Sequence, residues 1–385
     1  MSQSPNQHGL TEHSHGAVVP LQIRIDRPKS TSVSDFPAIS KTQDLWRYLD
    51  VEQLAGLDAD VLAEYKEQIS FTSQQGLSVS WIPSTDARVG SIGIPEDRVS
   101  AAAYTNASET LLVEINESLS EPATISVTGS GKTASALHVL VITKPQVEAT
   151  LVLDYRGLGV LGENVEISVG DSSQLNLVSV QTWDKGSVHV SAHYAKLGRN
   201  SLLKHTVATF GGDLVRITPI STLSSPGAEV EMNGVYFANA GQHIENRPFV
   251  DHAAPNCKSR VTYKGALSGE KAHTVWIGDV LIRVAAEGTD TYELNRNLLL
   301  TDGTRADSVP NLEIETGEIQ GAGHASASGR FDDEQLFYLQ ARGVSEAEAK
   351  RLVVFGFLLE LIQRTNVPEV IESLSNVLEE KLGVN

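Results

Sequence analysis

The chain has 385 residues, 41% of them hydrophobic and 20% charged, which is typical of a globular protein with a sizeable core. Its 30 lysines and arginines against 48 aspartates and glutamates give a formal charge of −18, which argues strongly against a nucleic-acid or anionic-membrane partner because phosphates would be repelled. The single cysteine, Cys257, excludes an internal disulfide and a four-cysteine metal site, and it is consistent with a reducing compartment.

The beginning of the chain is polar and lacks the apolar stretch of a secretory signal. The longest apolar run, 352–362, has about half the length needed to cross a bilayer, and it contains Glu360. We therefore expect a cytoplasmic protein without a membrane segment.

Residues 1–40 hold few large apolar side chains, which predicts a flexible tail because such a segment cannot offset its ordering entropy. Its three histidines, His8, His13 and His15, are interpreted as solvated rather than metal-binding. One alternating apolar stretch at 21–25 is compatible with a single strand.

Residues 41–107 are predicted to form an N-terminal helical region. Apolar residues recur three and four positions apart between 41 and about 70, which is the period of a helix. A second, short helix is expected over 98–107.

From 108 to 330 the dominant period is two, which predicts half-buried strands because successive side chains of a strand point to opposite faces. The strands recur every 12 to 20 residues and are separated by Gly, Asp, Asn or Ser. This spacing fits a large sandwich, a barrel or a β-solenoid, and without a strict short repeat the periodicity does not choose among them.

The period returns to 3.6 in a C-terminal helical region, 331–385. Helices are predicted over 333–342, ending at Gly343, over 346–364, and from Pro368 to about Leu382. The middle of the second helix is apolar almost all round, which indicates burial against the β core or under a partner.

Two glycine-rich motifs suggest nucleotide binding but fail in context. Gly157, Gly159 and Gly162 spell the dinucleotide-binding pattern, yet the residues after them alternate like strands instead of opening a helix. The sequence 129–133 resembles the end of a phosphate-binding loop but lacks its first glycine, since Ser126 stands there. We expect both to be β turns and this chain to bind no nucleotide.

No catalytic constellation is found. The acidic run 332–334 is best explained as the opening of a helix, where the helix dipole favours negative charge. His189 and His193 lie about 13 Å apart on one strand face, too far to share a metal, and are expected to be solvated or locally hydrogen-bonded. His252 and Cys257 lack a standard ligand spacing, so Cys257 is first interpreted as a small buried side chain.

Four segments resemble the SufB/SufD family of iron–sulfur cluster assembly proteins: SRVTYKG (259–265), TDTYELNRNLLLTDG (289–303), SVPNLEIETGEIQGAGHASASGR (308–330) and FDDEQLFYLQARG (331–343). The segment 44–54 is a weaker match to an N-terminal motif of that family. The shorter length and the single cysteine are similar to the SufD type.

The resemblance implies a mainly β fold, a right-handed parallel β-helix between N- and C-terminal α-helical regions. It also implies a non-enzymatic scaffold that pairs with a SufB-type subunit and binds a SufC-type ATPase. A transient iron–sulfur cluster or iron would then form at the SufB interface. A homodimer of the isolated chain stays open.

Candidate site residues follow from the same resemblance. His324 matches the histidine of the family's small-residue motif, and neutral imidazole is a good iron ligand. Cys257 is a second candidate ligand only if the fold brings it close, because Ala322 stands where some SufD-type chains have a cysteine. Phe355, Phe357 and Leu358 are the predicted SufC contact.

Two other functions remain open at this stage. A SufB-like homodimeric scaffold would need no separate partner, although the single cysteine argues against it. A β-helix enzyme acting on acidic polysaccharide would need clustered basic residues and paired carboxylates along a groove, and the charge of −18 would repel its substrate.

Overall fold

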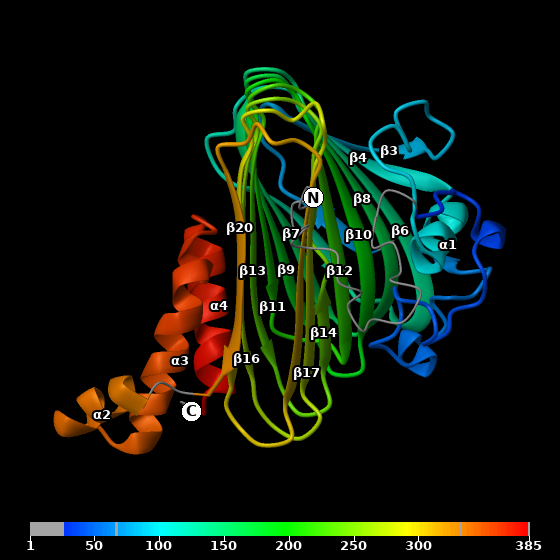
Figure 1. The fold of residues 1–385 in the computed structure, drawn as a ribbon. Coiled ribbons are helices and arrows are strands. Elements are labelled where there is room, and N and C mark those ends of the chain that lie inside the picture. Colours follow the sequence, from blue (N-terminus) through cyan, green and yellow to red (C-terminus); the bar gives the residue numbers. More distant parts are fainter. Residues whose placement is uncertain (1–26, 66–67, 331–332, 384–385) are drawn as a thin grey trace, which may run out of the picture.

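A computed structural model describes residues 27–65, 68–330 and 333–383. Most of this chain coils into a parallel β-helix, in which strands of two sheets lie side by side along a rod (Figure 1). The predicted fold class is thereby confirmed, and the solenoid is the correct choice among the three architectures that the periodicity allowed.

Both sheets of the β-helix are long. Sheet A contains β1 (Ala63–Glu64), β3 (Leu77–Pro83), β4 (Glu109–Ile115), β6 (Gly131–Thr143), β8 (Gly159–Val169), β10 (Val188–Leu197), β12 (Leu214–Leu223), β14 (His243–Asn246), β15 (Phe249–His252), β17 (His273–Ile282) and β19 (Arg305–Ile314). Sheet B contains β2 (Ile69–Phe71), β5 (Ala123–Thr128), β7 (Glu148–Gly157), β9 (Gln174–Trp183), β11 (Leu202–Thr209), β13 (Glu229–Ala238), β16 (Lys258–Leu267), β18 (Asp290–Leu299) and β20 (Gly321–Gly329).

The pairing is parallel along the rod, and only β3–β4 and β2–β5 are antiparallel among the described pairs. Register partners are one turn of the coil apart, from 26 residues between Val188 and Leu214 to 32 residues between Lys258 and Asp290. Partners in register point to the same face, so side chains stack in columns along the rod. One face of each sheet points into the interior.

The interior between the two sheets is the main hydrophobic core. Leu151, Leu177 and Val261 occupy one such column on sheet B and are fully buried. Because every second residue of a strand faces inward, the alternation seen in the sequence is the direct signature of this core.

The N-terminal region covers the outer face of sheet A. Its regular elements are η2 (Val33–Asp35), η3 (Val51–Leu54) and α1 (Arg98–Asn106), and Figure 1 shows α1 beside β6. Asp97 caps α1 by accepting a hydrogen bond from the backbone N–H of Ser100. The short helix predicted over 98–107 is confirmed.

The helix predicted between 41 and 70 is wrong. The described residues of this segment form turns, the short 3-10 helix η3, β1 and the start of β2. Ala55 and Gly56 take positive φ angles, which end the helical geometry of η3. The apolar residues of this segment nonetheless pack: Trp46 and Leu49 are buried against the outer face of sheet A. Their helical spacing reflects this burial instead of a helix.

The predicted tail is also too long. Val33, Phe36 and Ile39 are buried, so residues 27–40 are part of the packed structure. The three tail histidines and the strand considered at 21–25 lie outside the described residues, as does Asp332 of the acidic run.

The C-terminal region consists of α2 (Asp333–Ala341), α3 (Glu346–Gln363) and α4 (Pro368–Lys381), close to the predicted bounds. Gly343 ends the first of them with a φ of 89°. The helices α3 and α4 lie along the outer face of sheet B, whereas α2 projects away from the rod (Figure 1). No helix in the described part of the chain is long and apolar enough to span a membrane.

Candidate functional site

The β-helix has an open end, which we define as the last strands β19 and β20. Within the described residues, β19 pairs only with β17 and β20 only with β18 along these sheets. Each therefore presents one unpaired backbone edge, which is a template for strand addition by another chain. Any partner that extends the rod has to meet it at this end or the opposite one.

His324 lies on β20, at the open end. It is exposed, and it shares register with Glu293 of β18 and, one strand further, Val261 of β16. Because Val261 belongs to the interior core, His324 extends an interior column, and it is exposed because no further turn of the coil covers it. The imidazole has no hydrogen-bond partner among the described residues.

Glu293 is the buried neighbour of His324 on β18. It is 1% exposed, and neither carboxyl oxygen has a hydrogen-bond partner within the described chain. Burial, with a smaller contribution from the charge of Asp279, raises the pKa of Glu293 to about 8. A Cβ at Gly278 would lie 2.3 Å from the Trp276 ring and 2.8 Å from Glu293 Oε1, so the glycine lets the ring and this carboxyl pack against its backbone.

A hydrogen-bonded end network ties the last turns together. Asn297 Nδ2 donates to Asn295 Oδ1 at 2.8 Å and to Ser328 Oγ at 3.1 Å. Ser308 Oγ of β19 donates to Asn295 Oδ1 at 2.8 Å, and Ser326 Oγ of β20 lies 2.7 Å from Ser308 Oγ. Strands of both sheets are therefore joined across the interior, which holds the strand that carries His324 in place.

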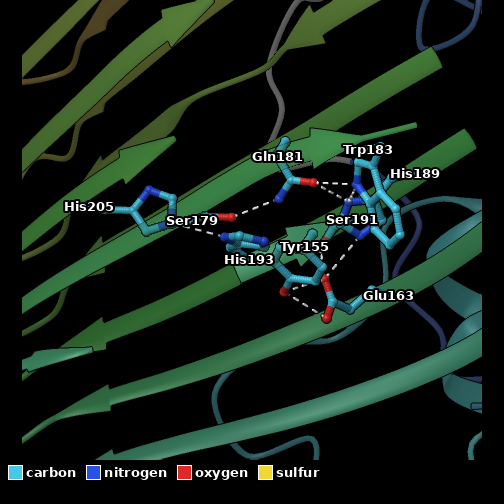
Figure 2. Close-up of polar contacts among 9 residues, drawn as sticks. All are labelled: Tyr155, Glu163, Ser179, Gln181, Trp183, His189, Ser191, His193 and His205. Carbon is cyan, nitrogen blue, oxygen red and sulfur yellow. Dashed lines mark hydrogen bonds and ion pairs between the residues drawn. The ribbon is translucent and has the colours of Figure 1, made fainter. Parts of the chain in front are cut away.

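A second buried polar group, shown in Figure 2, lies deeper in the rod around Glu163. Tyr155 and Ser191 donate hydroxyl hydrogen bonds to its carboxylate at 2.9 and 2.8 Å, and His189 Nε2 lies 3.2 Å from it. Gln181 Oε1 in turn lies 2.7 Å from His189 Nδ1. Every polar atom of Glu163 is thus matched, as a fully buried carboxylate requires.

A histidine pair lies beside this group. His193 Nδ1 and His205 Nε2 are 2.9 Å apart, and both side chains are fully buried (Figure 2). Burial lowers the pKa of His205 to about 4 and that of His193 well below its usual range, so both rings are neutral. The expected local hydrogen bonding of His189 and His193 is confirmed, whereas the solvated alternative is wrong because their strand face is the interior one.

Cys257 does not join His324. Its side chain is 1% exposed in the core, its Sγ lies 3.3 Å from the carbonyl oxygen of Ser225, and burial raises the pKa of the thiol. Cys257 directly precedes β16, and β18 lies between β16 and β20. Along the strand direction, Cys257 is four residues before Val261, the residue of β16 that shares register with His324. Strand geometry puts the two positions about 16 Å apart. The buried interpretation of Cys257 is confirmed, and the condition for a shared site is not met.

The three residues of α3 that were predicted to contact the ATPase differ in their burial. Leu358 is fully buried against sheet B, so its assignment to a partner surface is wrong. Phe355 and Phe357 are half-buried, and Lys264 Nζ lies 4.9 Å from the Phe357 ring centre. Among the side chains of the C-terminal region whose burial the structure describes, the large exposed apolar ones are Phe337, Tyr338 and Leu352.

The rejected motifs are turns and packed residues. Gly157 and Gly159 stand where β7 ends and β8 begins, and Gly131 opens β6 with a φ of 97°. His252 Nε2 is 2.9 Å from Ser259 Oγ inside the rod. None of these elements has the helix that a phosphate-binding loop needs.

The described residues contain no group of three or more His, Cys, Asp or Glu side chains that could hold a metal ion. The open end has one exposed imidazole and one buried carboxyl in neighbouring register positions. Further ligands would have to come from another chain. Sequence reasoning found His324 through its motif, but it missed Glu293, whose position becomes apparent only from the strand register.

Comparisons with known proteins agree with this arrangement. The family model for the SufBD core domain of SUF-system FeS cluster assembly matches residues 125–357. An iron–sulfur cluster assembly SufBD family protein of Mycobacterium tuberculosis is 47% identical over 365 residues, 92% of each chain. The iron–sulfur cluster assembly protein SufD of Escherichia coli is 24% identical over 84% of each chain, and that of Bacillus subtilis is 26% identical over 76% of this chain and 68% of the relative.

The matched region includes β6 to β19 and the open-end strand with His324. The family model covers more than half of the chain, and the mycobacterial relative covers nearly all of it. The chain belongs to the SufBD family of iron–sulfur cluster assembly proteins.

Proposed function

We propose that this chain is a non-enzymatic, SufD-type scaffold subunit of a SUF iron–sulfur assembly complex in the cytoplasm. It pairs with a SufB-type subunit through its open end and offers His324 to iron or a nascent cluster. The observation that carries the proposal is the exposed imidazole of His324 on an edge strand, without a partner in the described chain. Iron and the cluster are the cargo of this scaffold.

The pairing surface is supported by the unpaired edges of β19 and β20. A second β-helix can add its own edge strands here, and backbone hydrogen bonds would then provide affinity. The SufD type is supported by the state of Cys257, because a single buried thiol cannot supply the cluster ligands. The thiolates are assigned to the SufB-type partner.

The SufC-type ATPase is placed on the C-terminal helices. Phe337 is 72% exposed and Tyr338 is 57% exposed on α2, which projects from the rod (Figure 1). Exposed aromatic side chains of this kind are common anchors of protein interfaces. The half-buried Phe355 and Phe357 stay candidates at the margin of this surface.

The test is co-expression of the chain with a SufB-type and a SufC-type protein of the same genome, followed by affinity purification and anaerobic cluster reconstitution. His324→Ala is expected to purify in the complex but to lower the cluster yield, measured by visible absorption, at least about tenfold, as expected for losing a metal ligand. Gln320→Ala is the matched control, because Gln320 is exposed just before the same strand.

Two outcomes would contradict the proposal. Failure of the wild-type chain to co-purify with the SufB-type protein would remove the scaffold role. A cluster yield equal to wild type in His324→Ala would remove the assigned role of the imidazole while leaving the complex in place.

A further inference from the structure

Among the buried polar side chains of the described residues that lack partners, Glu293 stands out because both oxygens of its carboxyl group are without one. Glu163, another fully buried glutamate of the rod, has a hydrogen-bond donor for each oxygen. Glu293 has none within the described residues, and the nearby Tyr263 hydroxyl and Trp276 indole nitrogen also lack partners. Buried polar groups without partners are costly, so a cluster of them at one place indicates a function or a bound species.

The position of Glu293 relates it to His324. The two residues are register partners on adjacent parallel strands, so their side chains point to the same interior face from backbones about 4.8 Å apart. Flexible glutamate and histidine side chains at this separation can bring an oxygen and a nitrogen to within about 2.2 Å of a single ion. Neither side chain would have to give up another hydrogen bond to do so.

The two sides of the pair differ in how they are covered. Toward the interior, the Trp276 ring and Glu293 Oε1 pack against Gly278, where a Cβ would lie 2.3 Å from the ring and 2.8 Å from the oxygen. On β20, His324 is flanked by Gly323 and Ala325, so no bulky neighbour of the same strand covers the imidazole. The end network holds β18, β19 and β20 together just beyond the pair through Asn295, and therefore keeps the two strands in register.

We propose that Glu293 and His324 together bind one divalent iron ion at the open end of the β-helix. A carboxylate oxygen and an imidazole nitrogen form a donor pair suited to ferrous iron, and the remaining coordination positions face outward, toward water or a partner chain. The cation takes the place of the carboxyl proton, as is usual when a metal binds an acidic ligand. This inference rests on the proposed role of His324 and adds the residue that completes this chain's share of the site.

The experiment is a calorimetric titration of the full-length chain with Co²⁺, which substitutes for ferrous iron without its sensitivity to oxygen. All proteins carry His8→Ala, His13→Ala and His15→Ala, because three histidines within eight residues would bind Co²⁺ themselves. The protein with an intact pair is expected to bind one ion, and Glu293→Gln and His324→Ala are each expected to weaken binding at least about tenfold.

Asp290→Asn is the matched control for the loss of a carboxylate. Asp290 is on the same strand as Glu293, three residues away and on the opposite face, where it pairs with Arg260. This variant is expected to keep the Co²⁺ affinity of the parent protein. If Glu293→Gln does not fold, Glu293→Asp replaces it, and affinity is expected to fall because the carboxylate recedes by one methylene.

Unchanged Co²⁺ affinity in Glu293→Gln would overturn the inference, and so would unchanged affinity in Glu293→Asp if that variant has to be used instead. The absence of Co²⁺ binding by the parent protein would also overturn it. Co-purification of Glu293→Gln with the SufB-type protein separates this failure from failure of the scaffold role. A complex that forms normally without Co²⁺ binding leaves the proposed function standing and removes the metal pair. Co²⁺ binding without formation of the complex keeps the metal pair and removes the proposed scaffold function.

Discussion

At the scale of single residues, the interior of this β-helix is divided between matched and unmatched polar groups. Glu163 is held by Tyr155 and Ser191, and its carboxylate contributes to specifying how the strands around it stack. His193 and His205 form a neutral pair whose other ring nitrogens lack partners within the described residues. Protonating either ring inside the rod would place an unpaired charge in the core.

The histidine pair predicts how stability depends on pH. His205 has its pKa lowered from 6.5 to about 4 by burial, so the unfolded chain takes up a proton that the folded chain refuses. The contribution of His205 to the free energy of unfolding is therefore complete above pH 6.5 and is lost as the pH falls toward 4. Between pH 7 and pH 5 this loss is about 2 kcal/mol. His205→Asn is expected to reduce this loss by that amount, measured by urea unfolding at the two pH values.

The exposed His324 supplies the control for this measurement. His324→Asn replaces an exposed side chain and leaves the buried pair intact, so the difference in unfolding free energy between pH 7 and pH 5 is expected to stay at the wild-type value. An equal difference in wild type and His205→Asn would show that the buried pair is not the origin of the acid sensitivity.

At the scale of elements, the composition of β20 suits contact with the backbone of another chain. It consists of Gly, Ala and Ser around His324, residues that allow a second backbone to approach closely and that contribute little burial of their own. The helix α2 packs against α3 and projects from the rod, and its aromatic residues Phe337 and Tyr338 are exposed. In the proposed complex, β20 contacts the SufB-type subunit and α2 contacts the SufC-type ATPase.

The α2 surface can be tested with a double variant. Phe337→Ser combined with Tyr338→Ser is expected to weaken binding of the SufC-type ATPase at least about tenfold, because buried aromatic anchors often contribute 2 kcal/mol or more, as a rough figure. Binding is measured by surface plasmon resonance. The control is Val61→Ser, an equally exposed apolar residue on the N-terminal region, and weakening of equal size in that variant would refute the assignment to α2.

At the scale of the whole molecule, the rod is covered on both outer faces. The N-terminal region packs on sheet A through Trp46, whose ring lies 3.9 Å from the Arg216 guanidinium, and α3 and α4 pack on sheet B. Asn176 Nδ2 also donates to the carbonyl of Thr365 at 2.8 Å, which joins a central strand to the C-terminal region. Parallel sheets are normally covered in this way because both of their faces are apolar.

This covering predicts a stability effect at Leu358. Leu358→Ala is expected to lower the free energy of unfolding by about 2–5 kcal/mol, because it opens a cavity between α3 and sheet B. Leu352→Ala on the same helix is the control and is expected to change stability far less, since Leu352 is 42% exposed. Denaturant unfolding measures both, and equal effects would mean that α3 does not pack as described.

Local patterns in the sequence predicted much of this protein. The alternation from 108 to 330 is present in the strands. The C-terminal helices begin and end close to the predicted residues, because the Ser345 cap and Gly343 act locally. The helix predicted over 41–70 was wrong, since residues that pack on a sheet through turns can share the spacing of a helix. Leu358 was misplaced for a similar reason, because periodicity does not say which apolar face a neighbour covers.

The sequence by itself determined the class of strands and helices, the absence of nucleotide motifs and, through its motif, His324 as the residue of interest. Only the tertiary structure decided which strand face is interior, that Cys257 lies about 16 Å from His324, and that Glu293 is its neighbour. The reason is physical: a strand's alternation is set between adjacent residues, whereas stacking along the rod joins residues about 30 positions apart, such as Glu293 and His324, through a register that the whole coil fixes.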